Sequence, residues 1–153
     1  MKRSVYVSLI VLLIIATDQI TKYLVVKYLN PFDTINILPF LNLVSVRNTG
    51  GAFGMFRDIG SGFFIGAAIV AIIFVVWLLF KSKEDYLSLS LILGGAIGNL
   101  IDRIRFGYVV DFIDLFVGRF HWPAFNVADS ALSIGLLLYI AINLWPGHIR
   151  RHK

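Results

Sequence analysis

Four long apolar stretches constrain what this sequence of 153 residues can fold into. They cover residues 5–24, 61–80, 86–105 and 125–145, and each reaches the roughly 20 residues that a helix needs to cross about 30 Å of hydrocarbon. With 58% hydrophobic and 15% charged residues, the chain cannot hide its apolar side chains in its own core, because a chain of about 150 residues buries only about 70% of its surface. The sequence therefore excludes an ordinary water-soluble globule and predicts an all-α membrane bundle of four transmembrane helices.

Two longer segments, 25–60 and 106–124, connect spans on the side opposite the termini. Short runs rich in β-branched and apolar residues occur in them at 34–38, 41–47 and 108–117, separated by Pro and Gly residues. Such runs are typical of strands. We therefore expect a small extracytoplasmic β-sheet on the outer face of the bundle, within a single integral membrane domain formed by the whole chain.

Basic residues indicate the orientation of the spans. An even number of crossings puts both termini on one side, and the basic residues near the termini and in the link 81–85 are concentrated in short segments, which is typical of the cytoplasmic side. The basic and apolar start of the chain resembles a signal peptide, but no small-x-small cleavage site follows it, so we expect it to be retained. The net charge of +5 flanks apolar runs, so we expect no nucleic-acid partner.

Polar residues inside the spans are costly, by about 2.5–3.5 kcal/mol for Asp, Lys or Arg at the centre of a helix, and each needs a partner or a function. Asp18 and Lys22 are four residues apart near the outer end of the first span, so they share a helix face. They are either a structural ion pair or part of a site.

The third span carries Asn99, Asp102 and Arg103 near its outer end. Gly94 and Gly98 precede them with the small-xxx-small spacing that lets another helix approach closely. Close packing explains the glycines, but it does not explain why Asn99 and Asp102 share a face. We expect that face to point into the bundle or into a wet cleft.

The fourth span repeats this spacing with Asn126 and Asp129, shortly after Pro123, a residue that suits a helix start. Asn126 can be read simply as a helix cap. Asp129 lies one turn further in, where the capping explanation does not apply.

The segment 108–117 carries two more acids. In a strand Asp111 shares a face with Val109, Ile113 and Leu115, while Asp114 lies on the opposite face. An acid among apolar neighbours indicates a function, and the alternative is an edge-strand charge that prevents aggregation.

Carboxyls are the groups that remain for chemistry. The chain has no cysteine, no HExxH motif and no histidine constellation, since His121 stands alone between Phe120 and Trp122, so we expect no metal and no other cofactor. Two carboxyls held together share one proton and can perform acid–base hydrolysis. Composition alone does not choose the pair among the acids near the outer face, which are Asp102, Asp111, Asp114 and Asp129.

Five motifs occur in an order that resembles the lipoprotein signal peptidases, also called signal peptidase II, a family of bacterial membrane aspartic proteases. They are TDQITK at 17–22, RNTGGAFG at 47–54, GGAIGNLIDR at 94–103, VVDF at 109–112 and FNVAD at 125–129. The resemblance covers essentially the whole chain.

The resemblance implies a catalytic pair of Asp111 and Asp129. It also implies a set of residues that bind the substrate or support the site, namely Asp18, Asn48, Gly51, Asn99, Asp102, Arg103 and Asn126. The implied substrate is a prolipoprotein whose cysteine carries diacylglycerol, cut on the amino side of that cysteine, and the implied inhibitor is globomycin. Membrane lipids are the other expected partners, and we expect a monomer in the bacterial cytoplasmic (inner) membrane, with its active site near the outer face.

Two other classes of function remain as alternatives. One is a small proton-coupled transporter, although such proteins place their charges near the midplane at a repeat interface, and the other is a structural subunit that uses only its glycine faces. Within the peptidase hypothesis, Asp102 paired with Asp129 is the rival assignment. We predict instead that Asp111 and Asp129 face each other within a hydrogen bond or one water, with Asp102 outside the pair.

Overall fold

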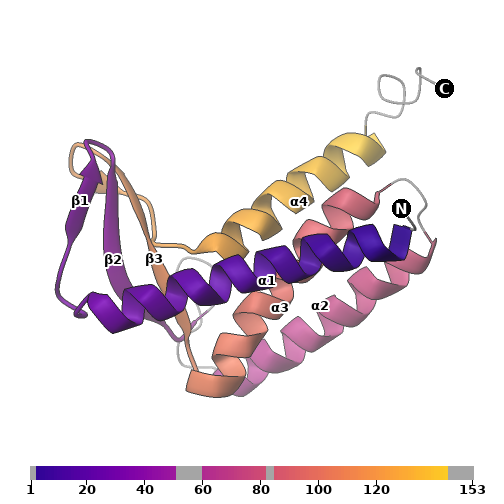
Figure 1. Ribbon diagram of the computed structural model, residues 1–153, viewed down its shortest axis with the longest axis horizontal. Coiled ribbons are helices and arrows are strands. Elements are labelled where there is room, and N and C mark those ends of the chain that lie inside the picture. Colours follow the sequence, from indigo (N-terminus) through magenta and orange to yellow (C-terminus); the bar gives the residue numbers. More distant parts are fainter. Residues whose placement is uncertain (1–2, 51–59, 82–84, 145–153) are drawn as a thin grey trace.

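The computed structural model describes residues 3–50, 60–81 and 85–144, which form a helical bundle with a small sheet at one end (Figure 1). In these residues the helices are α1 (Arg3–Tyr28), α2 (Ser61–Lys81), α3 (Tyr86–Phe106) and α4 (Val127–Leu144). The strands are β1 (Ile35–Leu38), β2 (Leu41–Asn48), β3 (Val109–Val117) and β4 (Phe120–His121). The expected combination of a mostly helical chain and a small sheet is therefore confirmed.

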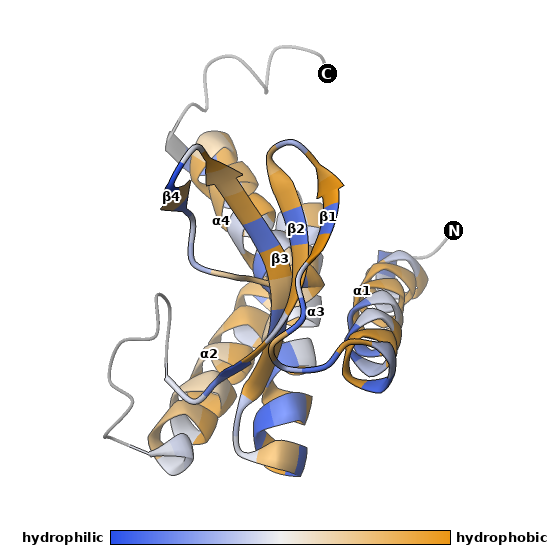
Figure 2. Ribbon diagram, turned by 90° about the vertical axis from the view of Figure 1, so that its left-hand side faces the viewer, coloured by the Kyte–Doolittle hydropathy of each residue, from blue (hydrophilic) through white to orange (hydrophobic). Residues whose placement is uncertain are grey.

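Helices α1, α2 and α3 are long and apolar enough to cross a membrane, with hydropathies of 1.9, 3.0 and 1.4 over 18-residue windows. Only 6% of the 18-residue apolar stretch of α2 is buried inside the protein, and Figure 2 shows this helix as almost entirely hydrophobic. Side chains of this kind require lipid around them. Helix α4 is apolar but shorter, and the expected end of the fourth span at residue 145 lies outside the described residues, so a fourth crossing stays a prediction.

Helix α3 is central and packs against the other three helices. A Cβ atom on Gly94 would lie 3.0 Å from the Cβ atom of Ile14 in α1, and one on Gly98 would lie 2.8 Å from Oδ2 of Asp18. The Cβ atom on Gly98 would also lie 3.2 Å from the Cβ atom of Ala128 in α4. The predicted close approach of helices at these glycines is therefore confirmed.

The sheet is antiparallel with strand order β1-β2-β3-β4. The three predicted strands form within one residue of their expected bounds, whereas β4 was not predicted. The chain turns back at Gly118, whose φ is 61°, and pairs His121 with Phe116. This short return brings residues 120–125 alongside β3.

Helix α4 begins at Val127, two residues after the expected start at residue 125. The reason is that Phe125 still belongs to the sheet, because it exchanges backbone hydrogen bonds with Ile113 at 2.8 and 3.1 Å. Asn126 then starts the helix by accepting the N–H of Asp129 on its side-chain oxygen at 2.8 Å. The capping explanation for Asn126 is confirmed.

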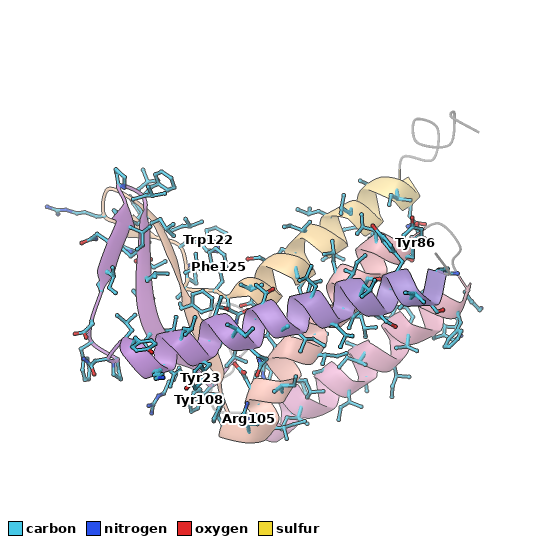
Figure 3. All side chains as sticks on the ribbon, in the orientation of Figure 1. Tyr23, Tyr86, Arg105, Tyr108, Trp122 and Phe125 are labelled. Carbon is cyan, nitrogen blue, oxygen red and sulfur yellow. The ribbon has the colours of Figure 1, made fainter. Side chains whose placement is uncertain are left out.

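The sheet stands where α1 and α3 end and where α2 and α4 begin (Figure 1). The opposite end of the bundle carries the start of α3, where Tyr86 lies (Figure 3). The buried polar residues Asp18, Lys22, Asn99, Asp102 and Asn126 come from the parts of the helices near the sheet. A functional site is therefore expected at this junction between the helices and the sheet.

Candidate active site

Asp111 lies near the start of β3 and is only 2% exposed. The side-chain amide of Asn126 donates to its Oδ1 at 2.7 Å, and that of Asn48 donates to its Oδ2 at 3.0 Å. Both carboxyl oxygens are thus held by neutral donors from different elements. A charge that protects a sheet edge is exposed, so the alternative reading of Asp111 as an edge charge is wrong.

Asp129 lies in the first turn of α4. The side-chain amide of Asn99 in α3 donates to its Oδ1 at 2.7 Å, and the backbone N–H of Asn126 donates to its Oδ2 at 3.3 Å. Because Asn126 in turn accepts the N–H of Asp129, the two residues cap the helix reciprocally. This contact holds the carboxyl of Asp129 at the start of the helix. The expectation that capping does not apply to Asp129 was therefore wrong, because the helix begins at Val127 and places Asp129 in its first turn.

One cavity of about 780 Å³ is lined by both Asp111 and Asp129. Asn48 contributes to it from β2 and Leu115 from β3, and residues between 122 and 134 form the rest of its wall. Figure 3 shows Trp122 and Phe125, two of these wall residues, at the junction between the sheet and α4. The cavity is therefore large enough for part of a peptide and reaches from the sheet onto a helix flank.

The environment of Asp111 favours its protonated form. Burial, followed by the negative charge of Asp129, raises the pKa of Asp111 to about 7, against the opposing hydrogen bonds from Asn48 and Asn126 and the charge of Lys22. A carboxyl that is close to half-protonated at neutral pH can serve as an acid or as a base.

The buried ammonium group of Lys22 lies close enough to the two carboxyls for its charge to act on them. Nζ of Lys22 is 2.8 Å from Oδ2 of Asp18 and 3.0 Å from Oδ2 of Asp102, and it donates to Oδ1 of Asn99 at 3.1 Å. The predicted ion pair between Asp18 and Lys22 is confirmed. Asn99 in turn donates to Asp129. Lys22 is therefore linked to the carboxyl of Asp129 through one intervening residue, Asn99.

The two acids that contact Lys22 also hold the backbone beside the cavity. Oδ2 of Asp102 accepts the N–H of Val110 at 3.1 Å, and Oδ1 of Asp18 accepts the N–H of Ala128 at 2.9 Å. Val110 immediately precedes Asp111, and Ala128 immediately precedes Asp129. The ion cluster therefore ties α1 and α3 to the chain positions next to both cavity carboxyls.

Arg103, also on α3, lies near the loop after β2. It donates to the carbonyl oxygen of Gly50 at 3.2 Å, while the N–H of Gly50 is held by Oδ1 of Asn48 at 3.0 Å. Gly51, another expected site residue, lies outside the described residues. Arg103 thus stabilises the turn that carries Asn48 into the cavity.

Sequence analysis named the acids, the amides and Lys22 of this region but missed one contributor, Gln19, which donates to Oδ1 of Asp102 at 3.0 Å. It also did not predict that Lys22 contacts Asn99 in addition to its helix partner Asp18. The signal for Gln19 was a polar residue within an apolar span. Asp114 does not line the cavity, since it pairs with Asn42 and His121.

In the described parts of the chain, no three acidic or histidine side chains form a group that could hold a metal ion.

Comparison of the fold with solved structures gives the class of protein. The chain is similar to a bacterial membrane enzyme solved by the in meso method at 2.3 Å, with a TM-score of 0.87, 35% sequence identity, and coverage of 97% of this chain and 93% of that chain. A second bacterial membrane enzyme, solved at 1.9 Å, matches with a TM-score of 0.82 and 36% identity over 91% of this chain and 92% of that chain. The protein has the fold of a multi-pass membrane enzyme.

The sequence comparisons identify the family. The pattern of the signal peptidase (SPase) II family matches residues 10–145. The lipoprotein signal peptidase of Thermodesulfovibrio yellowstonii is 56% identical over 137 residues, which cover 90% of this chain and 93% of that protein. That of Syntrophotalea carbinolica is 47% identical over 149 residues, which cover 93% and 92%. The chain therefore belongs to the signal peptidase II family and is a protease, and the transporter alternative is not supported.

Proposed function

We propose that this protease, which removes signal peptides from prolipoproteins, is an aspartic endopeptidase with Asp111 and Asp129 as its catalytic pair. One observation carries the proposal. The two carboxyls come from different elements, line one cavity and hydrogen-bond to the same residue, Asn126. Two carboxyls that are close enough for their negative charges to repel each other share one proton. The raised pKa of Asp111 supports such a pair.

The expected reaction is general acid–base hydrolysis. The ionised carboxyl takes a proton from a water molecule, and the water oxygen attacks the carbonyl carbon of the scissile peptide bond. The protonated carboxyl donates to the carbonyl oxygen as negative charge develops there. The C–N bond then breaks as the proton taken from water passes to the leaving amine. The proton on the former carbonyl oxygen returns to the carboxyl that donated it, which restores the singly protonated pair. We predict that the carboxyls of Asp111 and Asp129 face each other within a hydrogen bond or one water.

The amides around the pair would keep the carboxyls in place during these transfers. Asn48, Asn99 and Asn126 each donate to a carboxyl oxygen, and hydrogen bonds of this kind favour the ionised form over the protonated one. Positioning of reacting groups lowers the barrier because little reorganisation remains at the transition state. The other residues that we assign to support or to substrate binding are Asp18, Gly51, Asp102 and Arg103.

The substrate would be a prolipoprotein whose cysteine already carries diacylglycerol, cut on the amino side of that cysteine. The proposal follows the family resemblance and is supported by the wall of the cavity, where Trp122 and Ile134 are 58% and 52% exposed. Exposed apolar side chains beside the buried Asp111 and the half-buried Asp129 suit a ligand with a polar backbone and acyl chains. Globomycin-type peptides would occupy the same cavity.

The membrane setting follows from the same substrate. A cysteine anchored by acyl chains holds its peptide bond near a membrane surface, and the cavity lies at the end of the bundle that carries the sheet. We propose four crossings in the bacterial cytoplasmic (inner) membrane, with both termini cytoplasmic and the sheet outside. Surrounding lipids would cover α2, and the protein would act as a monomer.

The test is substitution of each acid, with binding and turnover measured separately. Asp111→Asn and Asp129→Asn should each lower turnover of a diacylglyceryl-modified prolipoprotein by about a hundredfold or more, with substrate binding largely kept. Normal turnover by either variant would rule out the pair. The matched control is Asp33→Asn, because Asp33 is an exposed acid of the outer segment that contacts Asn30.

A further inference from the structure

A row of polar side chains crosses the sheet, with one member from each strand. Asn36 of β1 donates to Oδ1 of Asn42 in β2 at 2.7 Å, and Asn42 donates to Oδ2 of Asp114 in β3 at 2.9 Å. Nδ1 of His121 in β4 lies 2.9 Å from both oxygens of Asp114. Figure 2 shows hydrophilic segments at about the same level on β1, β2 and β3, in strands that are otherwise largely hydrophobic.

The contact between Asp114 and His121 involves a carboxyl that is only 8% exposed. A carboxylate accepts at both oxygens, so the contact is a hydrogen bond from the tautomer of His121 that carries its proton on Nδ1. The ring of His121 also stacks on Phe116, with centroids 5.2 Å apart. An apolar pair would hold two strands without the desolvation cost of a carboxylate. The polar pair is therefore better explained by the specific position that it gives β4 than by a gain in overall stability.

Strand β4 needs such a contact because it is very short. It consists of Phe120 and His121, which pair with Val117 and Phe116. A two-stranded hairpin is marginally stable by itself. The hydrogen bond between His121 and Asp114 therefore helps to keep β4 in one position against β3.

Residues immediately after β4 form one wall of the cavity that holds Asp111 and Asp129. Residues 122–125 all line it. The N–H of Trp122 donates to the carbonyl oxygen of Leu115 at 2.7 Å, and Phe125 is bonded to Ile113. A displacement of His121 would therefore move Trp122, its chain neighbour, relative to the cavity.

We propose that Asp114 and His121 form a positioning pair that holds residues 118–125 against β3 and so sets the substrate-facing wall of the cavity. The pair acts on substrate binding through the wall and not on the proton transfers. This inference rests on the proposed function of the cavity as the substrate site. It assigns a role in substrate recognition to two residues that lie apart from the catalytic pair.

The first experiment compares two substitutions of His121. His121→Phe keeps a ring for stacking on Phe116 but removes the donor, whereas His121→Asn keeps a donor at the position of Nδ1. We expect His121→Phe to raise KM for a diacylglyceryl-modified prolipoprotein about fivefold or more with kcat within about twofold, and His121→Asn to restore most of the difference. An unchanged KM, or an equal effect of both substitutions, overturns the proposal.

The second experiment replaces the contact with a covalent bond. Phe116 and His121 pair directly across β3 and β4, and such pairs are about 4.5–5.5 Å apart in Cα positions, within the range that a disulfide spans. The chain has no cysteine of its own. The variant with Phe116→Cys and His121→Cys should have a low KM when oxidised and a KM about fivefold higher or more when reduced, in one and the same protein. Equal KM values in both states contradict a positioning role.

A control within the row separates positioning from general destabilisation. Asn36→Ala removes the end of the row that is farthest from β4, so it should lower the thermal stability without changing KM. A rise in KM equal to that of His121→Phe would show that any weakening of the sheet has this effect and would overturn the proposal.

A final measurement is independent of catalysis and of the proposed catalytic pair. The protein has three tryptophans, and Trp77→Phe with Trp145→Phe leaves Trp122 as the single fluorophore. In that background, His121→Phe should raise quenching of Trp122 by acrylamide about twofold, and His121→Asn should not. Unchanged quenching overturns the inference, whereas normal turnover by Asp111→Asn overturns the proposed function and leaves this result standing.

Discussion

Asp102 accepts the backbone N–H of Val110 on Oδ2 at 3.1 Å, which ties α3 to the strand residue immediately before Asp111. The same oxygen lies 3.0 Å from Nζ of Lys22, and Oδ1 accepts a hydrogen bond from Gln19 at 3.0 Å. Both oxygens of Asp102 are thus engaged by fixed donors. A carboxyl held in this way stabilises the backbone beside the cavity and does not suit proton transfer to a substrate.

We expect Asp102→Asn to act mainly on stability. Removal of one partner from a buried ion cluster costs about 3–5 kcal/mol, so thermal unfolding in detergent should begin at a clearly lower temperature. At a temperature where the variant is folded, turnover should fall less than in Asp129→Asn. Normal thermal stability together with a complete loss of turnover would instead support the rival pairing of Asp102 with Asp129.

Gly98 is expected to tolerate no side chain. Because a Cβ atom there would lie 2.8 Å from Oδ2 of Asp18 and 3.2 Å from Ala128, Gly98→Ala should destabilise the protein by about 1–3 kcal/mol through overpacking. Thermal unfolding is the measurement. The matched control is Gly66→Ala in α2, where nothing lies within 4 Å of the added atom, and an equal loss in both variants would contradict close packing as the cause.

The activity should depend on pH through Asp111. Since its pKa is raised to about 7, the pair should lose its shared proton as the pH rises through about 7, and kcat/KM should fall there. The hydrogen bond from Asn48 favours the ionised form of Asp111. Asn48→Ala should therefore raise this pKa further and move the alkaline limb of the pH profile to higher pH. A shift to lower pH would contradict the assignment.

The stability should depend on pH through the same carboxyl, with a sign that follows from its raised pKa. The folded protein binds this proton more tightly than the unfolded chain, in which an Asp carboxyl has a pKa near 3.9. Its contribution to stability is therefore fully present below about pH 4 and is lost as the pH rises through about 7. Asp111→Asn cannot titrate, so its unfolding temperature relative to the parent should be higher at pH 8 than at pH 5. A constant difference would contradict the raised pKa.

The orientation in the membrane can be tested with introduced cysteines, because the chain contains none. Val117→Cys lies at the exposed end of β3, where the native side chain is 80% exposed, and should react with a membrane-impermeant maleimide in intact cells. Lys81→Cys, at the end of α2, should react only after permeabilisation. The parent chain is the unlabelled control, and the reverse pattern would contradict an outer sheet.

Features that depend on neighbours along the chain could be predicted from the amino-acid sequence alone. Apolar runs of sufficient length predict membrane helices whatever the helices pack against, and the spacing of Asp18 and Lys22 brings them together on any helix. Short runs rich in β-branched and apolar residues predicted three strands to within one residue of their bounds. The cap at Asn126 is equally local, because it is made to the turn that follows it.

Features that depend on how separate elements meet became known only from the packing of those elements. Spacing shows that Asn99 and Asp102 share a face, but only the packing of α3 between α1 and α4 directs Asn99 to Asp129 and Asp102 to the backbone before Asp111. The same holds for Asp114 and His121, which sequence analysis left without partners. Hydrogen bonds between distant segments require one specific arrangement in space, and no periodicity within a single element encodes that arrangement.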